Sequence, residues 1–120
     1  MWENMYVEEI AAYHLKKFIR RLDEIGLRVY TYGMELSTKT KKRVSNILFG
    51  VISNYYLIEW LIDRLGIENV DRNLLRVIVY RLVVERNREV MNRVEQVGGI
   101  DLEDLYNALI ELVRKIEEMP

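Results

Sequence analysis

The sequence contains no cysteine, one proline and one histidine. The absence of cysteine excludes disulfide bonds, thiolate zinc ligands and a cysteine nucleophile from this chain. No apolar run approaches the roughly 18 residues that a bilayer-spanning helix needs. The N-terminus MWENMYVEEI carries acids where a secretory signal carries basic residues. We therefore expect a cytoplasmic protein without a membrane partner.

Neither sign of charge dominates, because 18 Lys and Arg residues stand against 19 Asp and Glu residues. At the level of the whole chain this balance gives no sign of a nucleic-acid partner, and we expect no binding to DNA. Half of the 120 residues are hydrophobic and 31% are charged, which is typical of a folded globular protein. The length suits one domain with its own core, so we predict a single domain over residues 1–120.

Apolar residues recur at helical spacing through almost the whole chain. Capping residues and glycines mark where this pattern starts and stops. Together they predict helices over about 4–25, from Ser37 or Thr38 to Gly66 with a bend at Ser53–Asn54, from Asp71 to about 84, over about 87–97 with Asn87 as the cap, and from Asp101 to about 117.

Two segments rich in β-branched residues admit a strand as the alternative. We interpret LRVYTYGMEL, residues 27–36, as a short helix or irregular bridge, because no second strand is available to pair with it. Residues 71–84 carry apolar side chains on nearly every side, which predicts a helix surrounded by others. The sequence thus predicts an all-α fold: a compact bundle of about six to seven helices around a central apolar helix.

Four short patterns follow one another along the chain. The runs ILFGVISNYYLIEWLIDRL, DRNLLRVIVYRLV and NALIELVRKI resemble the NusB-like domain that precedes the methyltransferase domain in Sun-type RNA cytosine-C5 methyltransferases. The resemblance covers roughly residues 37–117. The matching residues are Leu48, Gly50, Val51 and Asn54, then Ile58, Trp60, Leu61 and Ile62, then Leu74, Leu75, Arg76, Tyr80 and Leu82, and finally Asn107, Leu109, Arg114 and Ile116.

The chain departs from the family pattern in ways that bear on function. Ser53 stands where the family often has arginine, and Glu3, Glu8 and Glu9 replace the arginine-rich arm of free-standing NusB proteins. The chain has no S-adenosylmethionine loop and no cysteine for the C5 chemistry. The resemblance therefore implies a NusB-like fold and an accessory role in RNA binding, without methyltransferase activity in this chain.

Gly50 lies inside the long predicted helix, where glycine costs about 1 kcal/mol relative to alanine. It shares one side of that helix with Asn46, Ser53 and Asn54, a stripe of small and amide side chains. Such a stripe permits the close approach of a neighbouring helix or of a nucleic-acid backbone. The family resemblance favours a helix against Gly50, and we expect Asn54 to fix the bend.

The residues offer no catalytic constellation, metal-ligand set or cofactor loop. The single histidine, His14, lies beside the apolar face of the first helix and is interpreted as a partly buried structural residue. Paired acids such as Glu8–Glu9 are adjacent in sequence, so they point to different sides of a helix, and we interpret them as solvated surface residues. We therefore predict neither an enzyme nor a bound cofactor.

Positive charge is concentrated at the start of the second predicted helix. Four bases stand there with no acid nearby, and we call them the basic cluster: Lys39, Lys41, Lys42 and Arg43. Residues 59–120, by contrast, carry nine bases against thirteen acids. Backbone N–H groups point outward at a helix start, so a phosphate finds two favourable contributions in one place. The alternative is a cap that is solvated or paired with the acidic C-terminal tail.

Further candidates for phosphate contact lie on two other helices. Lys16, Lys17 and Arg20 form a stripe on the first helix, where nearby acids neutralise part of the charge. Arg72 and Arg76 lie one turn apart and extend the surface from the N-terminal end of the central helix. Core packing is the favoured interpretation of Arg28, Tyr30 and Tyr32, and stacking on unpaired bases is the alternative.

These residues and the resemblance together predict an accessory RNA-binding module. It would hold structured RNA through phosphate contacts and position ribosomal or transfer RNA for a methyltransferase domain. The alternative, from a different class, is a NusB-type module that binds a partner protein and has no intrinsic affinity for RNA.

Overall fold

The computed structural model describes residues 6–19, 37–94, 96–97 and 99–118. Within these ranges the protein is all-α, as predicted, with six α-helices, one π-helical segment and one pair of two-residue strands. The elements in chain order are α1 (Val7–Ile19), α3 (Thr38–Ser53), α4 (Tyr55–Leu65), α5 (Arg72–Val79), η2 (Tyr80–Val84), α6 (Val90–Arg93), β1 (Gln96–Val97), β2 (Ile100–Asp101) and α7 (Leu102–Glu117).

Capping interactions set the predicted starts of three helices. The Ser37 hydroxyl accepts a hydrogen bond from a first-turn N–H of α3, and the carboxylates of Asp71 and Asp101 do the same for α5 and α7. Gly66 ends α4 with a left-handed φ of 65°, a conformation that glycine adopts without steric cost. These boundaries confirm the prediction. The predicted bridge at 27–36 lies outside the described residues.

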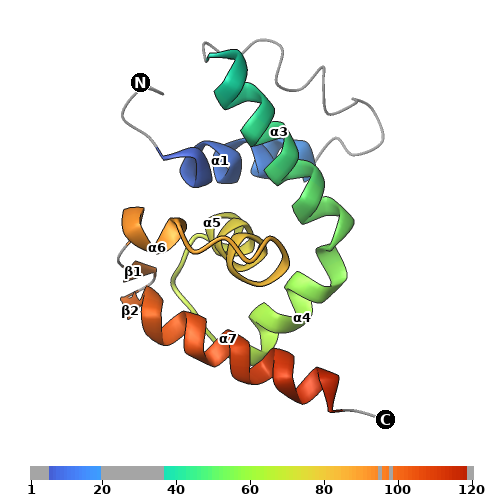
Figure 1. Cartoon of the computed structure of the whole chain (residues 1–120), viewed down its shortest axis with the longest axis vertical. Helices are drawn as coiled ribbons and strands as arrows, with labels where there is room; N and C mark the ends of the chain where they lie inside the picture. The colour runs from blue at the N-terminus through green and yellow to red at the C-terminus, as the bar shows by residue number, and fades with distance from the viewer. Residues whose placement is uncertain (1–5, 20–36, 95, 98, 119–120) are drawn as a thin grey trace.

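The long predicted helix is divided at Asn54, where the bend was expected. The backbone of Asn54 leaves the helical region at φ −116° and ψ 24°, and its side-chain amide donates a hydrogen bond of 2.8 Å to the carbonyl of Gly50. The Gly50 carbonyl thus accepts twice, from this amide and from the backbone N–H of Asn54 at 3.1 Å, which ties the bend to the last turn of α3. In Figure 1, α3 and α4 consequently form one arc along the side of the molecule.

The central helix is α5, which Figure 1 shows nearly end-on in the middle of the bundle. It packs against α1, α3 and α4, while its continuation η2 packs against α3 and α7. Leu75, Val77, Ile78 and Val79 are completely buried. An apolar stretch on several sides of a helix requires neighbours on all of them, so the predicted central position is confirmed.

The predicted helix from Asp71 to about 84 changes character at Tyr80, where the π-helical segment η2 begins. The ring of Tyr80 lies against the backbone of Gly50, because a Cβ built on Gly50 would be 2.1 Å from Tyr80 Cζ. The close approach expected at Gly50 is therefore real, and the approaching group is an aromatic ring of the central helix. Burial, and then the nearby Glu85 carboxylate, raises the pKa of the Tyr80 phenol, which keeps it neutral in this contact.

A buried ion pair joins the next residue of η2 to the first helix. Arg81 Nε lies 3.2 Å from Glu8 Oε2, and Arg81 Nη1 lies 2.7 Å from Glu85 Oε1. The side chains of Arg81 and Glu8 are 5% and 0% exposed. The interpretation of Glu8 as a solvated surface residue was therefore wrong, because its carboxylate is buried against Arg81. Two charges removed from water in this way need each other, so the pair fixes α1 against η2.

The segment after the π-helical turn differs from the prediction of one short helix over about 87–97. The helix α6 spans only Val90–Arg93, Val94 is already extended, and Val97 pairs with Ile100 in an antiparallel ladder around Gly99, whose φ is 79°. The β-branched valines suit the strand conformation. Placing Val94 and Val97 on a helix was therefore wrong. Asn87 was expected to be the helix cap, but it accepts from the N–H of Glu89 ahead of the helix.

The contact at Gly50 predicts an effect of Gly50→Ala whose sign depends on Tyr80. In the wild-type background the new methyl group displaces the ring, and we expect the free energy of unfolding to fall by about 1–3 kcal/mol. In a Tyr80→Ala background the space is open, and the same substitution is expected to raise that free energy by about 1 kcal/mol through helix propensity. Urea unfolding of the four proteins measures both effects, and stabilisation in the wild-type background would contradict the contact.

The buried pair of Glu8 and Arg81 predicts that substitution of Glu8 alone lowers the free energy of unfolding more than substitution of both residues. Glu8→Leu leaves the buried Arg81 guanidinium with Glu85 as its remaining carboxylate partner, and we expect a loss of about 3 kcal/mol in the free energy of unfolding. Arg81 Nη2 already lacks a hydrogen-bond partner among the described residues, so the charge is imperfectly compensated. Glu8→Leu with Arg81→Met should therefore recover most of the loss in thermal and urea unfolding. A double variant as unstable as Glu8→Leu would show that the pair is not the cause.

Candidate nucleic-acid interface

The basic cluster occupies the first turns of α3, as the sequence predicted. No acid is present in the first turn of this helix. Lys39 and Lys42 are exposed, whereas Lys41 and Arg43 are half-buried. The Ser37 hydroxyl accepts from the backbone N–H of Thr40, so it satisfies one of the outward-pointing donors and leaves others to solvent or ligand.

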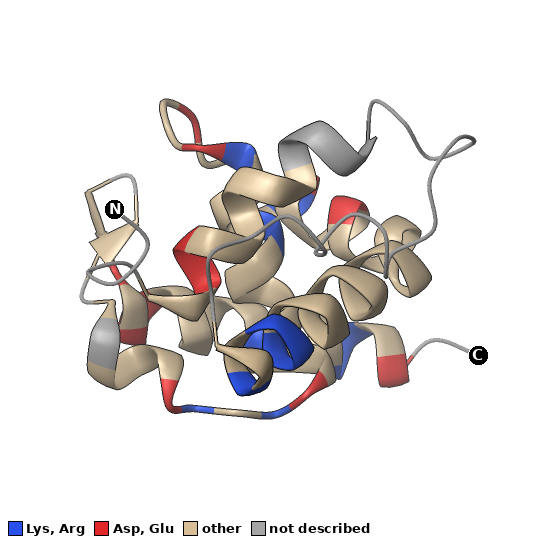
Figure 2. Cartoon of the chain, turned by 90° about the horizontal axis from the view of Figure 1, so that it is seen from above, with Lys and Arg blue, Asp and Glu red and all other residues tan. Residues whose placement is uncertain are grey.

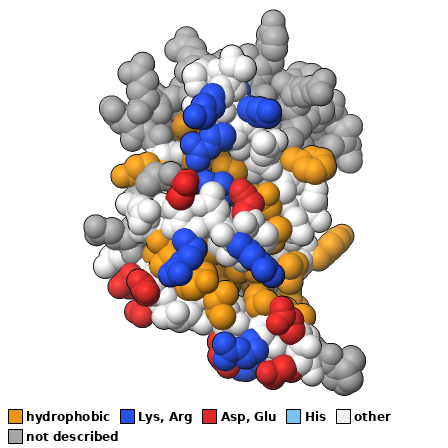
Figure 3. Space-filling model, in the orientation of Figure 1, with side chains coloured by type: hydrophobic (Ala, Val, Ile, Leu, Met, Phe, Trp, Pro, Cys, Tyr) orange, Lys and Arg blue, Asp and Glu red, His pale blue; other side chains and the backbone are white. Residues whose placement is uncertain are grey.

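The surroundings of the basic cluster are free of acids in the part of the chain that the structure describes. There, no carboxylate lies within ion-pairing distance, 4.0 Å, of any of its four side chains. Figure 2 looks onto this end of the molecule and shows the beginning of α3 in blue, and Figure 3 shows Lys and Arg side chains gathered over the same turns. The acid-bearing helix α7 lies at the opposite end of the bundle in Figure 1.

Arg72 and Arg76 have a different environment from the basic cluster. The guanidinium of Arg72 lies 2.7 Å from Glu59 Oε2 and 2.8 Å from Asp63 Oδ1, while that of Arg76 donates from Nε to the other oxygen of Glu59. Arg76 also donates to the side-chain oxygen of Asn73 at 2.6 Å. Both arginines thus fasten α5 to α4, and their charge is largely balanced by carboxylates.

Glu59 is the acceptor at the centre of this network. Burial by itself would raise the pKa of its carboxyl group, but hydrogen bonds from Arg76 and Arg72, and then their charges, hold the pKa below its ordinary value. Hydrogen bonds to Asp63 and Glu59 in turn raise the pKa of Arg72. Glu59 therefore stays ionised, and its side chain is only 19% exposed.

Several other predicted contacts fall outside what the structure describes. Arg20, Arg28, Tyr30 and Tyr32 lie in a segment that is not described, and the described backbone of α1 includes Lys16 and Lys17 without their side chains.

His14 is 8% exposed and packs edge-to-face on Tyr13 with ring centroids 5.1 Å apart, which agrees with the predicted structural role.

Exposed aromatic side chains on the α3–α4 arc were not anticipated from the sequence. Phe49 is 66% exposed and Tyr56 is 89% exposed. A heptad spacing from Lys42 through Phe49 to Tyr56 was the available signal, because residues seven apart lie on the same side of a helix. The apolar pattern instead directed attention to the opposite, buried side of α3.

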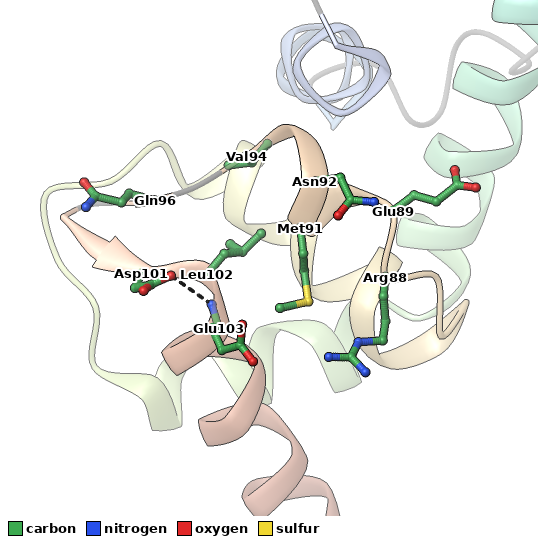
Figure 4. Close-up of a pocket in the computed structure, with 9 residues that line it drawn as sticks. All are labelled: Arg88, Glu89, Met91, Asn92, Val94, Gln96, Asp101, Leu102 and Glu103. Carbon is green, nitrogen blue, oxygen red and sulfur yellow. Dashed lines mark hydrogen bonds between the residues drawn. The ribbon is translucent and has the colours of Figure 1, made fainter.

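A hollow of about 760 Å³ lies between α6, the strand pair and the start of α7. Figure 4 shows Gln96 and Glu89 at its opposite ends and Met91 between them. Two of its polar side chains are engaged elsewhere: Asp101 caps α7, and the Arg88 guanidinium lies 4.7 Å from the centre of the Tyr106 ring. The charged residues of the remaining lining, Glu89 and Glu103, are both acidic and lie on different sides of the hollow in Figure 4.

A smaller groove of about 390 Å³ lies between η2, the loop after it and α7. Arg86, Arg88 and Arg114 stand around it, but Arg88 already stacks on Tyr106 and Arg114 lies 3.4 Å from Glu111.

Among the described residues, no group of three or more His, Asp or Glu side chains is arranged to hold a metal ion. None of the described helices combines the length and apolar character that crossing a membrane requires.

No known family model, curated protein or solved structure matches this chain. The resemblance to the NusB-like domain of Sun-type methyltransferases therefore stays a prediction. The site is defined by its own geometry, an exposed cationic helix start on an all-α bundle.

The Glu59 network predicts an acid-dependent stability difference. Because the pKa of folded Glu59 lies below the unfolded value of 4.5, its ion pairs contribute fully above that pH and are lost as the pH falls through the folded pKa. Thermal unfolding of wild type and Glu59→Gln should therefore show a stability gap that is constant above pH 4.5 and narrows below it. Glu68→Gln, at an exposed site, is the control, and a gap that persists in acid would contradict the prediction.

Proposed function

We propose that this protein is an accessory RNA-binding module whose basic cluster contacts the phosphates of an RNA strand. The observation that carries the proposal is the set of four cations in the first turns of α3, with no carboxylate within 4.0 Å among the described residues. Cations at a helix start oppose the helix dipole, so their placement is unfavourable for the isolated helix. A polyanionic ligand removes that penalty.

The geometry favours contacts to the backbone of RNA over the reading of bases. Phosphate contacts come from Lys and Arg side chains and from helix N-termini, and they position a nucleic acid without reading its sequence. Lys39 and Lys42 are exposed on α3 and are available for such contacts. Arg72 and Arg76 are occupied by Glu59 and Asp63, so the proposed interface is confined to the basic cluster and its surroundings.

The resemblance to the NusB-like domain supports a specific setting for this module. In that setting it would act in the cytoplasm and position ribosomal or transfer RNA for a methyltransferase domain, which supplies the S-adenosylmethionine chemistry. The chain itself lacks the cysteine that C5 methylation uses. With few phosphate contacts, isolated binding is expected to be weak and sensitive to salt.

The alternative is a module that binds a partner protein instead of RNA. Exposed apolar side chains at Tyr6, Tyr13, Phe49, Tyr56 and Leu57 favour this alternative. They are spread over two separate parts of the molecule, α1 with its approach and the α3–α4 arc, and single exposed apolar residues are normal on protein surfaces. The cationic helix start is therefore the stronger observation.

Removal of two charges from the basic cluster should weaken RNA binding and reduce its salt dependence. For Lys39→Ala with Lys42→Ala, the two exposed lysines of the basic cluster, we expect the slope of log affinity against log salt to become shallower by roughly 1.5, at about 0.7–0.9 per lost phosphate contact. The measurement is fluorescence anisotropy with a labelled RNA stem-loop that carries a single-stranded tail, between roughly 50 and 200 mM salt.

A charge-matched control separates local contacts from net charge. Arg114→Ala with Lys115→Ala removes two exposed cations from α7, at the other end of the bundle, and should leave affinity and slope nearly unchanged. Equal losses in both double variants would reduce the effect to net charge and contradict the assigned interface. If the wild-type protein does not bind RNA at low salt, the proposed function is wrong.

A further inference from the structure

The two most exposed aromatic rings of the described residues lie in line with the basic cluster. An ideal helix drifts by only about 20° over seven residues, so Lys42 and Phe49 lie on nearly one line along α3, and Tyr56 follows seven residues later on α4, beyond the bend. At about 1.5 Å of rise per residue, successive members of this line are roughly 10 Å apart. Phe49 and Tyr56 are 66% and 89% exposed, so the faces of both rings are open to solvent.

The line continues across the bend between α3 and α4. Two hydrogen bonds of helical spacing meet at the bend: Asn54 N donates to Gly50 O at 3.1 Å, and Ile58 N donates to Asn54 O at 3.0 Å. The backbone of Asn54 itself lies outside the helical region, so the position of Tyr56 relative to Phe49 is set by the shape of the arc. In Figure 3, hydrophobic side chains stand out from the right-hand edge of the molecule, where Figure 1 places this arc.

Two charged residues stand at the far end of the line: Asp63, seven residues beyond Tyr56 and 2.8 Å from the guanidinium of Arg72, and next to it the cation Arg64. Trp60 is four residues beyond Tyr56, and the guanidinium of Arg64 lies 4.9 Å from the centre of the Trp60 ring. Arg64 is exposed and makes no ion pair among the described residues. The exposed side of the arc thus has lysines at one end, two open rings in the middle and a flat guanidinium at the other end.

We propose that this line is a stacking platform for unpaired bases, which makes the preferred ligand a single-stranded RNA segment that runs along the α3–α4 arc. We call Lys42, Phe49, Tyr56 and Arg64 the stacking line. The inference rests on the proposed function, and it adds the class of RNA. Bases stack on Phe49 and Tyr56, while Lys42 and Arg64 contact phosphates on either side.

Each alternative ligand leaves part of this arrangement unused. A duplex keeps its bases stacked on one another and offers the rings nothing to stack on, whereas every unpaired base presents a flat face. For a protein partner, the buried centre of an interface is usually depleted of charge. Here Lys42 precedes the rings, and Arg64 follows them beside Asp63, whose charge is balanced by Arg72. The exposed polar Ser53 separates the two rings. Charge complementarity therefore favours a polyanion with exposed bases.

The test compares two RNAs and substitutions on the rings. The RNAs are a labelled oligouridine, which has no secondary structure, and a fully paired duplex of the same length. We expect Phe49→Ala and Tyr56→Ala each to weaken oligouridine binding about 5- to 150-fold, the range for one lost base–aromatic stack. Duplex binding should change by less than about twofold, and the salt dependence should stay as in wild type, because no phosphate contact is removed.

Two matched variants make the result specific to stacking. Tyr56→Phe keeps the ring and should keep oligouridine affinity within about twofold, which excludes a role for the hydroxyl group. Tyr6→Ala removes an exposed tyrosine that lies off the stacking line and should have no effect. Both rings are exposed, so circular dichroism melts of all variants should match wild type.

The outcomes separate this inference from the proposed function. If wild type binds both RNAs and the Phe49→Ala, Tyr56→Ala double variant binds oligouridine as well as wild type does, the stacking line is wrong while RNA binding stands. Equal loss for oligouridine and duplex, or a change only in the oligomeric state by sedimentation, would also overturn it. If wild type binds neither RNA, the proposed function itself fails.

Discussion

The guanidinium of Arg81 is the group on which the arrangement of this bundle depends most. It lies inside the protein between the carboxylates of Glu8 and Glu85, one from the first helix and one from the end of the central element. A charge in such a place is tolerated only where its partners are held at bonding distance. The ion pair with Glu8 therefore fixes the position of α1 along the central helix. Because α3 packs on α1, this ion pair also helps to position α3.

Tyr80, the neighbour of Arg81, places α3 from the other side. Its ring occupies the space that a side chain at Gly50 would fill, so the ring packs directly on the backbone of α3. Just beyond Gly50, the amide of Asn54 bonds to the backbone carbonyl of this glycine. The missing side chain at Gly50 thus determines where α3 touches the centre, and Asn54 marks where the arc bends.

The parts of the structure that follow local rules were predictable from the sequence. Ser37, Gly66, Asp71 and Asp101 end or begin helices because of short-range hydrogen bonds and backbone preference, and the apolar run after Asp71 required a central position. The π-helical turn and the two-residue ladder after α6 were not predictable. They depend on contacts between distant parts of the chain, such as Arg81 with Glu8, which no local pattern contains.

In the candidate site, too, features set by the local sequence were predictable, and features set by tertiary contacts were not. The basic cluster is contiguous in sequence and could be identified directly, and its position at the start of a helix followed from Ser37. Whether a cation is available for a ligand is a different matter, because it depends on tertiary partners. Arg72 and Arg76 resembled the other candidates until Glu59 and Asp63 of α4 were found beside them. The exposure of Phe49 and Tyr56 likewise required knowledge of which side of the arc faces the core.

The separation between the start of α3 and the helix α7 has a kinetic consequence. The described helices bear their unopposed cations at one pole and an excess of acids at the other, which gives this part of the molecule an electric dipole moment despite its small net charge. In the field of an approaching polyanion such a dipole experiences a torque that turns the α3 pole forward before contact. Productive orientation would then be selected during diffusion, and added salt would slow association more than it speeds release.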